Sequence, residues 1–478
     1  MRLTLRSFAL AALAGIAGCR PADVLSVPAP AGVQTVGALQ SQTGAEEAFN
    51  GAKGQLFNAA DGGGNGGLLD WTGMLTDEFT AVVASEPDYT NVDARITVGG
   101  GGYGEGGDFP WTTLLQARSS LVLVLPLLEK YEPGSSQSKV GEAFALMGYD
   151  ELLIAESYCA GTPFDVVLPG GGIQYGMPLT TDSMLGVAQA HFDSAVAHAA
   201  GDAGIAAFSG IGLGRTLTDR GQYAAAATAV HNAPTAYVYN IELEPNENAA
   251  PYTPGAYAYG VAYSTSSLFN VSDHEGGNGL DFVSAHDPRL QFDTSLMTAD
   301  GTALRIPLKF EANLSFIPLA TGIEARLIEA EAALKAGQPA TWLADLNALR
   351  NSGCTVSGSD TTCSLGNGQV PSQTVGLPSL SDPGTDSGRV SLHFRERAFW
   401  LFGTGTRLGD LRRLIRQYGR TQSTVFPTGT YANGHNASLP APIPTYGTDV
   451  SLTLPTRQSG TAITNPYYKG CLSPTSTP

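Results

Sequence analysis

Charged side chains are scarce in this chain of 478 residues, and basic ones are scarcer than acidic ones. Only 14% of the residues are charged, and 26 basic against 43 acidic residues give a formal net charge of −17. Because nucleic-acid-binding proteins neutralise phosphates with Lys and Arg, this balance excludes nucleic acid as an expected partner. Long apolar runs are also missing. Beyond the N-terminus the longest is Leu121–Leu128, far short of the roughly 20 residues of a transmembrane helix.

Common signatures of catalysis and metal binding are absent as well. The sequence has no HExxH, GxSxG, Walker A or EF-hand pattern. Glycine runs at 62–67 and 99–104 match GxGxxG, but neither follows a strand of a βαβ unit. His191 and His198 have no third candidate ligand nearby, so we expect surface or packing residues there. We therefore expect no cofactor, no metal and no enzymatic activity, with one alternative left open. That alternative is a glycoside hydrolase, because the distance between its two catalytic carboxylates is spatial and cannot be read from the sequence.

The N-terminus has the pattern of a lipoprotein signal peptide over residues 1–18. Two arginines are followed by the apolar stretch Phe8–Ile16, and small residues precede Cys19. We expect a lipidated Cys19 at the start of the mature chain. Residues 19–42, rich in Pro, Ala and Ser, form the expected anchor and tether. Acyl chains on one cysteine hold a protein on a bilayer without a spanning segment.

Cysteine is rare, and its number fits an exported protein. Besides Cys19 there are four cysteines, an even number. Cys354 and Cys363 flank a segment rich in Ser, Thr and Gly, so we expect a local disulfide there, with Cys159 and Cys471 as the complementary pair. A zinc site is not expected, because the four cysteines contain no CxxC pair and have no histidine nearby.

The body of the chain, residues 43–478, has the periodicity of paired amphipathic helices. Phe49, Ala52, Leu56 and Ala59 recur at the spacing of one buried helical face. Similar patterns predict helices over 111–131 and 140–158, over 181–199 and 222–230, and over 323–334 and 342–349. The pairs indicate a mainly α fold of degenerate tetratricopeptide-like repeats, around 43–231 and 320–418.

Several segments between these helices have no helical period. They are 61–67, 86–110, 201–214, 244–319 and 356–389. Loops of this length in a compact domain are usually functional or contain short strands. We therefore expect a loop-rich insertion around 244–319 and a few short strands.

The densest group of charges in the chain is the block 395–413, which contains five arginines, Glu396 and Asp410. One hypothesis is an anion-binding site. We favour a network of ion pairs that joins the last helices to the core, because Glu396 and Asp410 can pair with the arginines. Trp342 and Trp400 fall on amphipathic helices and are expected in the core.

Short motifs occur in a characteristic order along the chain. They are Gly-Thr-Pro-Phe at 161–164 after a long helix, Met-Pro-Leu-Thr at 177–180, Asp-Pro-Arg at 287–289, Leu-Asn-Ala-Leu-Arg at 346–350, the block 395–413, and Asn-Pro-Tyr-Tyr at 465–468. Together with the cysteine at the end of the signal peptide, this order resembles the SusD/RagB family of outer-membrane nutrient-binding lipoproteins.

The resemblance implies a helical fold with tetratricopeptide-like units and a loop-rich half that faces the ligand. It also implies an outer-membrane location with the lipid-anchored protein at the cell surface. The implied partners are a SusC-like TonB-dependent β-barrel transporter and an oligosaccharide or other oligomeric nutrient. A tetratricopeptide-like scaffold in envelope assembly and a secreted glycoside hydrolase are the alternative hypotheses.

Binding without covalent chemistry needs aromatic platforms on loops, where sugar faces stack and nearby amides and carboxylates bind hydroxyls. Asn270 lies within one loop that is rich in aromatic residues. The candidate ligand contacts are Tyr89, Tyr103, Tyr252, Tyr257, Tyr259 and Tyr263.

Overall fold

A computed structural model describes most of the chain. The described residues are 39–478 except 62–66, 83–86, 98–107, 132–136, 169–171, 200, 243–268, 295–296, 298–302, 308–315, 353, 358–359, 364–376, 432–442, 456, 459–460 and 463. Cys19 and the predicted signal peptide and most of the tether therefore lie outside the described part.

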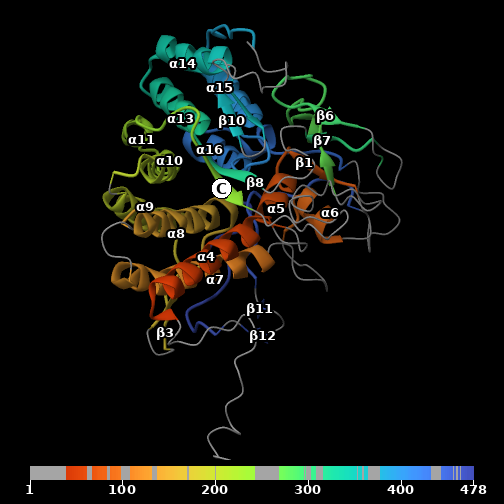
Figure 1. Ribbon diagram of the computed structural model, residues 1–478. Coiled ribbons are helices and arrows are strands. Elements are labelled where there is room, and N and C mark those ends of the chain that lie inside the picture. Colours follow the sequence, from red (N-terminus) through yellow and green to blue (C-terminus); the bar gives the residue numbers. More distant parts are fainter. Residues whose placement is uncertain are drawn as a thin grey trace, which may run out of the picture.

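Helices dominate the structure, as the sequence predicts. Eight of them follow one another in a stack, in which each packs against the next, from α4 and α7 at the bottom of the view to α14 at the top (Figure 1). They are α4 (Gln42–Asp61), α7 (Asp108–Tyr131), α8 (Gln137–Ser157), α9 (Thr181–His198), α10 (Ala203–Asp219), α11 (Tyr223–Val230), α13 (Gly322–Lys335) and α14 (Pro339–Ser352). The mainly α fold with successive helix pairs is thus confirmed.

The remaining described elements are shorter or lie beside the stack. The helices are α5 (Leu68–Met74), α6 (Pro87–Asp93), α15 (Asp386–Trp400) and α16 (Arg407–Tyr418), with 3-10 turns at Glu275–Gly277 and Gln422–Thr424. Helix α16 packs against α8 and α5, and α15 packs against α13. These contacts join the end of the chain to the helical stack.

The strands are short and form antiparallel pairs. Sheet partners distant in sequence are β1 (Phe79–Ala81) with β5 (Phe269–Val271), and β4 (Val238–Glu242) with β8 (Phe316–Thr321). The other pairs are β2 (Val166–Val167) with β3 (Ile173–Gln174), β6 (Phe292–Asp293) with β7 (Ile306–Pro307), β9 (Cys354–Ser357) with β10 (Asp360–Cys363), and β11 (Arg457–Gln458) with β12 (Thr461–Ala462). The expected short strands are therefore present within 244–319 and 356–389.

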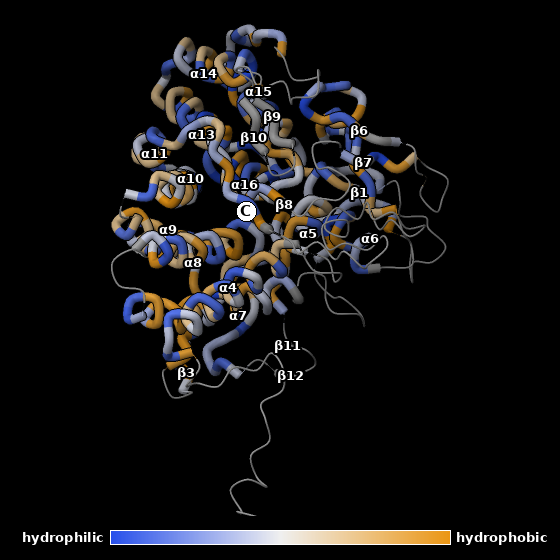
Figure 2. The backbone as a smooth tube through the Cα atoms, in the orientation of Figure 1, coloured by the Kyte–Doolittle hydropathy of each residue, from blue (hydrophilic) through white to orange (hydrophobic). Residues whose placement is uncertain are grey.

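The helical stripes predicted from periodicity are buried. Phe49, Ala52, Leu56 and Ala59 are at most 4% exposed, and hydrophobic and hydrophilic residues alternate along the stacked helices (Figure 2). Trp342 is fully buried and Trp400 is 3% exposed, as expected. Burial of such apolar stripes, at roughly 25 cal/mol per Å2, stabilises the stack.

One helix, α7, is long and apolar enough by length and composition to cross a membrane. It packs between α4 and α8, and half of its most apolar window is buried inside the protein. These contacts are those of a core helix.

Residues 201–214, predicted as a loop, instead form most of α10, so that prediction is wrong. Asp202 caps the helix, accepting hydrogen bonds from the backbone N–H groups of residues 204 and 205. Gly210, Gly212 and Gly214 are poor helix formers, yet neighbouring helices press on all three. A Cβ on Gly210 would lie 2.6 Å from the Ala229 carbonyl oxygen of α11. Close packing of α10 therefore outweighs its weak intrinsic propensity.

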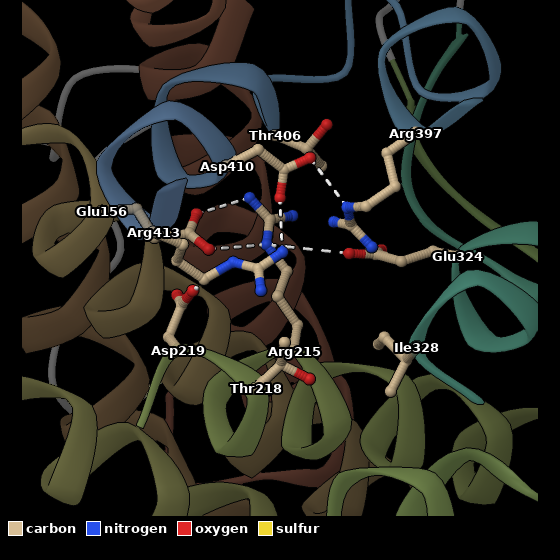
Figure 3. A pocket seen from close by; sticks show the side chains of 10 residues that line it. All are labelled: Glu156, Arg215, Thr218, Asp219, Glu324, Ile328, Arg397, Thr406, Asp410 and Arg413. Atoms are coloured by element: carbon tan, nitrogen blue, oxygen red, sulfur yellow. Dashed lines mark hydrogen bonds and ion pairs between the residues drawn. The ribbon is translucent and has the colours of Figure 1, made fainter. Parts of the chain in front are cut away.

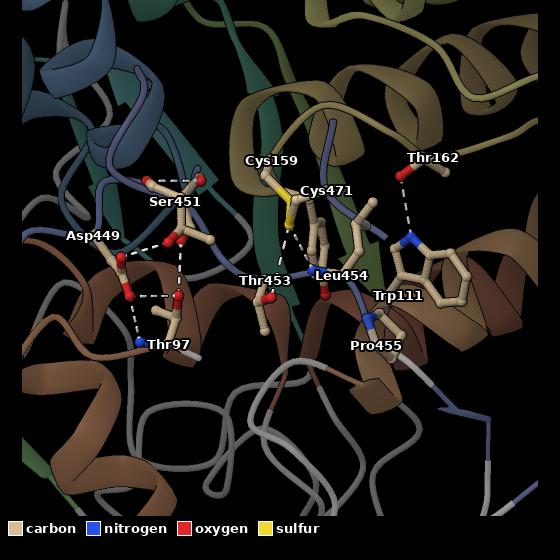
Figure 4. The surroundings of a disulfide bond; sticks show 12 residues. Thr97, Trp111, Cys159, Thr162, Asp449, Ser451, Thr453, Leu454, Pro455 and Cys471 are labelled. Carbon is tan, nitrogen blue, oxygen red and sulfur yellow. Dashed lines mark hydrogen bonds between the residues drawn. A yellow bond between two sulfur atoms is a disulfide. The ribbon is translucent and has the colours of Figure 1, made fainter. Parts of the chain in front are cut away.

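A disulfide joins the end of α8 to the C-terminal segment. Cys159 and Cys471, separated by 312 residues, are bonded with their Cα atoms 5.6 Å apart (Figure 4). This is the pairing that the sequence predicts as the complement of Cys354 with Cys363. The β9–β10 hairpin places Cys354 directly opposite Cys363 in register, and the disulfide expected between them stays a prediction.

Candidate functional site

Most of the charged block 395–413 lies in the core. Arg397, Asp410 and Arg413 are at most 3% exposed. Arg397 Nε and Arg413 Nη2 each donate to a different oxygen of Asp410, both at 2.7 Å. Arg413 Nη2 also donates to Glu331 of α13 at 3.0 Å. The block therefore forms the predicted ion-pair network. One of its acidic partners, Glu331 of α13, lies outside the block.

The network continues into the helical stack. Arg215 of α10 donates through Nε to Glu156 of α8 at 2.8 Å and lies 3.8 Å from Glu324 of α13 (Figure 3). Arg413 Nε lies 3.3 Å from Asp219 at the end of α10. The space among these side chains is about 10 Å3, enough for a single water molecule. This cluster joins five helices, α8, α10, α13, α15 and α16, and has no room for an organic ligand.

Pairing and burial set the protonation of its acids in opposite directions. Burial favours the neutral form of Glu331, but the Arg413 and His393 side chains outweigh it and hold the pKa of Glu331 well below its usual value. Burial, followed by the charge of Glu156, raises the pKa of Asp219 well above its usual value. The same core therefore holds one carboxyl group that favours its ionised form, Glu331, and one that favours its neutral form, Asp219.

Three of the sequence motifs meet at Glu396 of α15. Arg289, from the Asp-Pro-Arg turn, donates through Nη1 to Glu396 Oε2 at 2.8 Å. Arg350, at the end of the 346–350 motif, donates through Nη1 to Oε1 at 2.7 Å. Asp287 holds Arg289 from the other side, at 2.7 Å. Glu396 thus pairs with arginines from distant motifs and not, as expected from the sequence, with those of its own block.

The candidate pocket is a separate cavity of about 700 Å3 beside the β1–β5 pair. Its walls come from the end of β1, from β5 and the turn after it, and from two segments near the C-terminus. The lining residues are Thr80, Val82, Asn270, Ser272–Gly277, Arg305, Thr428–Thr430 and Tyr446. The cavity has the size of a small-molecule or oligomer site.

Backbone contacts hold the walls of the candidate pocket in place. Asn270 Oδ1 accepts from the backbone N–H of Arg305 at 2.9 Å, and Asn270 Nδ2 donates to the Ala303 carbonyl at 3.0 Å. Gly276 adopts φ +59°, and a Cβ there would lie 2.4 Å from the Thr428 nitrogen. Only glycine fits this turn, which lets the 275–277 wall approach the C-terminal wall.

Tyr446 is the aromatic residue among the described pocket lining. Its hydroxyl donates to Glu275 Oε1 at 3.1 Å, and its half-buried ring packs edge-on against Tyr431 with centroids 5.1 Å apart. Tyr431 is itself 1% exposed. The Tyr446 ring is therefore fixed on both sides at the pocket wall.

The predicted tyrosines fall into two groups. Tyr89 lies in the core, 7% exposed, with its ring 4.4 Å from that of Trp71. It is not available as a sugar platform, because α6 places it against α5. The other five, Tyr103, Tyr252, Tyr257, Tyr259 and Tyr263, lie outside the described residues. Asn270, named beside them, does line the pocket.

Neither histidine on α9 belongs to a metal site within the described part of the chain. His191 Nδ1 lies 2.6 Å from Glu151, and His198 Nδ1 lies 2.8 Å from the Ser194 carbonyl. Both rings contact Phe144. They pack between α8 and α9, in line with the expectation.

A second pocket of about 390 Å3 lies along α4 and α7, on the side of the β2–β3 hairpin. Gln55, Leu115, Ile173 and Asp165 are among its lining residues. The Asp165 carboxylate is already used, accepting from the backbone of residue 176 and from Asn465. This pocket lies away from the loop-rich half.

Sequence reasoning missed Tyr446 and Glu275 as members of one site. They are 171 residues apart, and no periodicity or motif links them. The signals available were local: Tyr446 follows two prolines at 442 and 444, and Glu275 precedes a pair of glycines. Such patterns predict turns, and their meeting in space is decided by tertiary packing.

No protein-family model matches the chain, and no curated protein matches it either. Solved structures are similar in fold. A SusD-like carbohydrate binding protein from Bacteroides vulgatus has a TM-score of 0.56 and 15% identity, covering 78% of this chain and 83% of that one. A SusD superfamily protein from Bacteroides fragilis has a TM-score of 0.56 and 15% identity, covering 84% of this chain and 96% of that one.

A SusD-like protein from Bacteroides fragilis has a TM-score of 0.54 and 11% identity, with 95% of this chain and 100% of that one covered. The likeness to this protein therefore extends over nearly the whole chain. At such identities it concerns the fold, and the order of motifs noted in the sequence agrees with it. This chain has the fold of the SusD superfamily.

Proposed function

We propose that the protein is a surface-exposed lipoprotein that binds an oligomeric nutrient, a glycan, and delivers it to a SusC-like TonB-dependent transporter in the outer membrane. The observation that carries the proposal is the fold shared with a protein described as SusD-like and carbohydrate binding. The signal-peptide pattern that ends at Cys19 supports the anchor.

The candidate pocket supports a glycan as ligand. Tyr446 offers a fixed aromatic ring, and the surrounding Thr428 and Thr430 offer hydroxyl groups. Sugars bind through this combination of an apolar face and neutral hydrogen-bonding groups. The segment 243–268, which carries four of the predicted tyrosines, joins β5 directly, and Asn270 of β5 lines the pocket.

The pocket also favours binding without hydrolysis. Its two acids are held by contacts within the protein: Glu275 accepts from the Tyr446 hydroxyl, and Asp273 accepts from the backbone N–H groups of residues 283 and 284. Glycosidase carboxyls stand about 5 Å or more apart, with the sugar between them. Carboxyls that are already engaged in this way are not placed to act on a sugar between them, which favours binding over hydrolysis.

Glycan binding by wild-type protein and by Tyr446→Ala tests the pocket, first on an immobilised glycan array and then by titration calorimetry. Loss of a stacked ring should weaken binding by about tenfold, since aromatic contacts contribute about 0.5–1.5 kcal/mol beyond area burial. Tyr467→Ala is the matched control, because Tyr467 is 47% exposed and lies outside the pocket lining. Equal affinities for all three proteins would reject this pocket, and no binding to any glycan would reject the ligand class.

The anchor and the transporter need separate tests. Cys19→Ala should release the protein from membranes in soluble form, because the acyl chains would have no attachment site. Persistent membrane association of that variant would contradict the lipid anchor. Affinity purification of the wild-type protein from mildly solubilised outer membranes should recover a large TonB-dependent barrel in near-equal amount. Recovery of envelope-assembly proteins instead would favour the scaffold hypothesis.

A further inference from the structure

A single arginine side chain lines the candidate pocket. Arg305, just before β7, is the only lysine or arginine among the described lining residues, and it is half-buried. A guanidinium keeps its charge at every physiological pH, because its pKa lies above 12. The wall of the cavity therefore carries a permanent positive charge.

Strand β5 holds Arg305 at two points. The Arg305 backbone N–H donates to Asn270 Oδ1 at 2.9 Å, and Arg305 Nη1 donates to the Val271 carbonyl at 2.8 Å. Asn270 is itself 2% exposed, and its Oδ1 also accepts from the backbone N–H of Val271 at 2.9 Å. The guanidinium is thus attached to β5 through its Nη1 end.

The opposite edge of the guanidinium, formed by Nε and Nη2, is not engaged. Among the described residues, no acceptor takes a hydrogen bond from either nitrogen, and Arg305 forms no ion pair. An arginine edge with two parallel N–H groups matches the two oxygens of a carboxylate. Arg305 therefore presents a ready carboxylate-binding edge at the wall of the cavity.

Other arginines of this chain show what occupies the same edge. Arg407 donates through Nε and Nη2 to the two oxygens of Asp77, at 2.7 and 2.8 Å. Arg215 binds Glu156 in the same way, at 2.8 and 2.5 Å. In these pairs the carboxylate belongs to the protein. At Arg305 no described carboxylate takes this place, although acidic residues outnumber basic ones in the sequence.

The two acids of the described lining have other partners. Asp273 Oδ1 accepts from the backbone N–H groups of residues 283 and 284, each at 3.0 Å. Glu275 Oε1 accepts from the Tyr446 hydroxyl at 3.1 Å. Burial raises the pKa of Glu275 well above its usual value, so its neutral form is favoured. Neither acid forms an ion pair with Arg305, whose charge stays available to a ligand.

The net charge of the chain does not prevent an anionic ligand from reaching this place. The formal charge of −17 is spread over the whole protein. Interactions between exposed charges are largely screened beyond about 8 Å at physiological ionic strength. A carboxylate on the Arg305 edge would lie at hydrogen-bond distance, where the pairing is screened far less.

We propose that the ligand of the candidate pocket is an acidic glycan, and that the carboxylate of one of its uronic acid units binds the Nε and Nη2 groups of Arg305. The ring of Tyr446, which lines the same cavity, is available to stack on a sugar. This inference rests on the proposed function and names its substrate class.

The probes are oligomers of galacturonate, mannuronate and glucuronate, each paired with its carboxyl-reduced form. Reduction of the carboxyl to a primary alcohol leaves a neutral chain of the same length and linkage. Titration calorimetry on the whole protein should find an acidic chain that binds about 10- to 100-fold more tightly than its reduced form, because a hydrogen-bonded charge contact contributes this much. Equal affinity for both forms of every chain would overturn the carboxylate contact and leave glycan binding in place.

Substitution of Arg305 tests the residue. In Arg305→Gln the affinity for the acidic chain should fall to that for the reduced chain, whose own affinity should stay at the wild-type value. Arg420→Gln is the matched control and should bind as the wild type does. Arg420 is also half-buried, donates through Nη2 to the Ser387 carbonyl at 2.8 Å, and lies outside the pocket lining. An unchanged preference in Arg305→Gln, or an equal loss for both forms, would overturn the proposal.

Two further outcomes are decided by the same measurements. If Arg305→Gln does not fold, Arg305→Lys keeps the charge without the two-bond edge and should lower the preference for the acidic chain by about tenfold. An unchanged preference in that variant would overturn the two-bond contact. Absence of binding to every chain, acidic or neutral, would reject the proposed function together with this ligand.

Discussion

Gly210 and Gly54 offer the same substitution in two opposite settings. Both glycines lie inside helices, α10 and α4. A Cβ added to Gly210 would lie 2.6 Å from the Ala229 carbonyl oxygen, whereas a Cβ on Gly54 would meet nothing within 4 Å. Alanine stabilises a helix interior by roughly 0.5–1 kcal/mol relative to glycine. Intrinsic propensity alone therefore predicts that both substitutions are stabilising.

Packing reverses the sign at Gly210. The obstructing atom belongs to the backbone of α11 and cannot move as a flexible side chain would, so α10 and α11 must separate. Overpacking of a close interior usually costs about 1–3 kcal/mol. After the gain in propensity is subtracted, Gly210→Ala should lower the free energy of unfolding by about 1–2 kcal/mol. Gly54→Ala should raise it by up to about 1 kcal/mol.

Urea unfolding followed by far-ultraviolet circular dichroism measures both changes. The informative quantity is the difference between the two variants, about 1–3 kcal/mol, because the propensity term is common to both and only the overpacking cost remains. A shift of equal sign and size in the two variants would refute the reasoning. It would mean that α10 is helical for local reasons and that its contact with α11 does not depend on glycine.

Two further predictions concern the buried network and the disulfide. Glu331→Gln removes one charged partner of Arg413 in the core, while Asp410 stays paired with it, and should lower the free energy of unfolding by about 1.5–3 kcal/mol, measured in urea at neutral pH. Because the folded pKa of Glu331 lies well below its usual 4.5, its contribution is full above that pH and is lost on acidification, so the wild type should lose its advantage over the variant in acid. Cys471→Ala removes the bond to Cys159 and should lower the free energy of unfolding by about 2–4 kcal/mol, with wild type in reductant matching the variant. If reductant leaves the unfolding midpoint of the wild type unchanged, the disulfide prediction is wrong. If the difference in free energy of unfolding between the wild type and Glu331→Gln does not depend on pH, the prediction for Glu331 is wrong.

The candidate pocket illustrates why a site made of loops escapes sequence analysis. Its walls come from β1, β5, the 275–277 turn and segments near residues 428–430 and 446. Each wall contributes one to a few polar residues, and no wall has a distinctive pattern by itself. Aromatic content pointed to the loop after β4, whereas the aromatic residue of the described lining is Tyr446, nearly 200 residues further along.

The amino-acid sequence by itself determined the helices whose apolar residues recur every three to four positions. Stripes such as Phe49, Ala52, Leu56 and Ala59 are buried because helical geometry places such residues on one face. The sequence also identified the block 395–413 as an ion-pair network, since a dense group of arginines with acids in a weakly charged chain needs partners.

Tertiary structure alone decided which distant residues meet. Helix α10 forms despite its glycines because α9 and α11 pack against it, and Tyr89 is buried because α5 covers it. Glu396 takes its arginines from two other motifs, and Tyr446 meets Glu275 across 171 residues of chain. Periodicity is a local property of the backbone, whereas these contacts depend on how separate elements share one interior, where every buried polar group needs a partner.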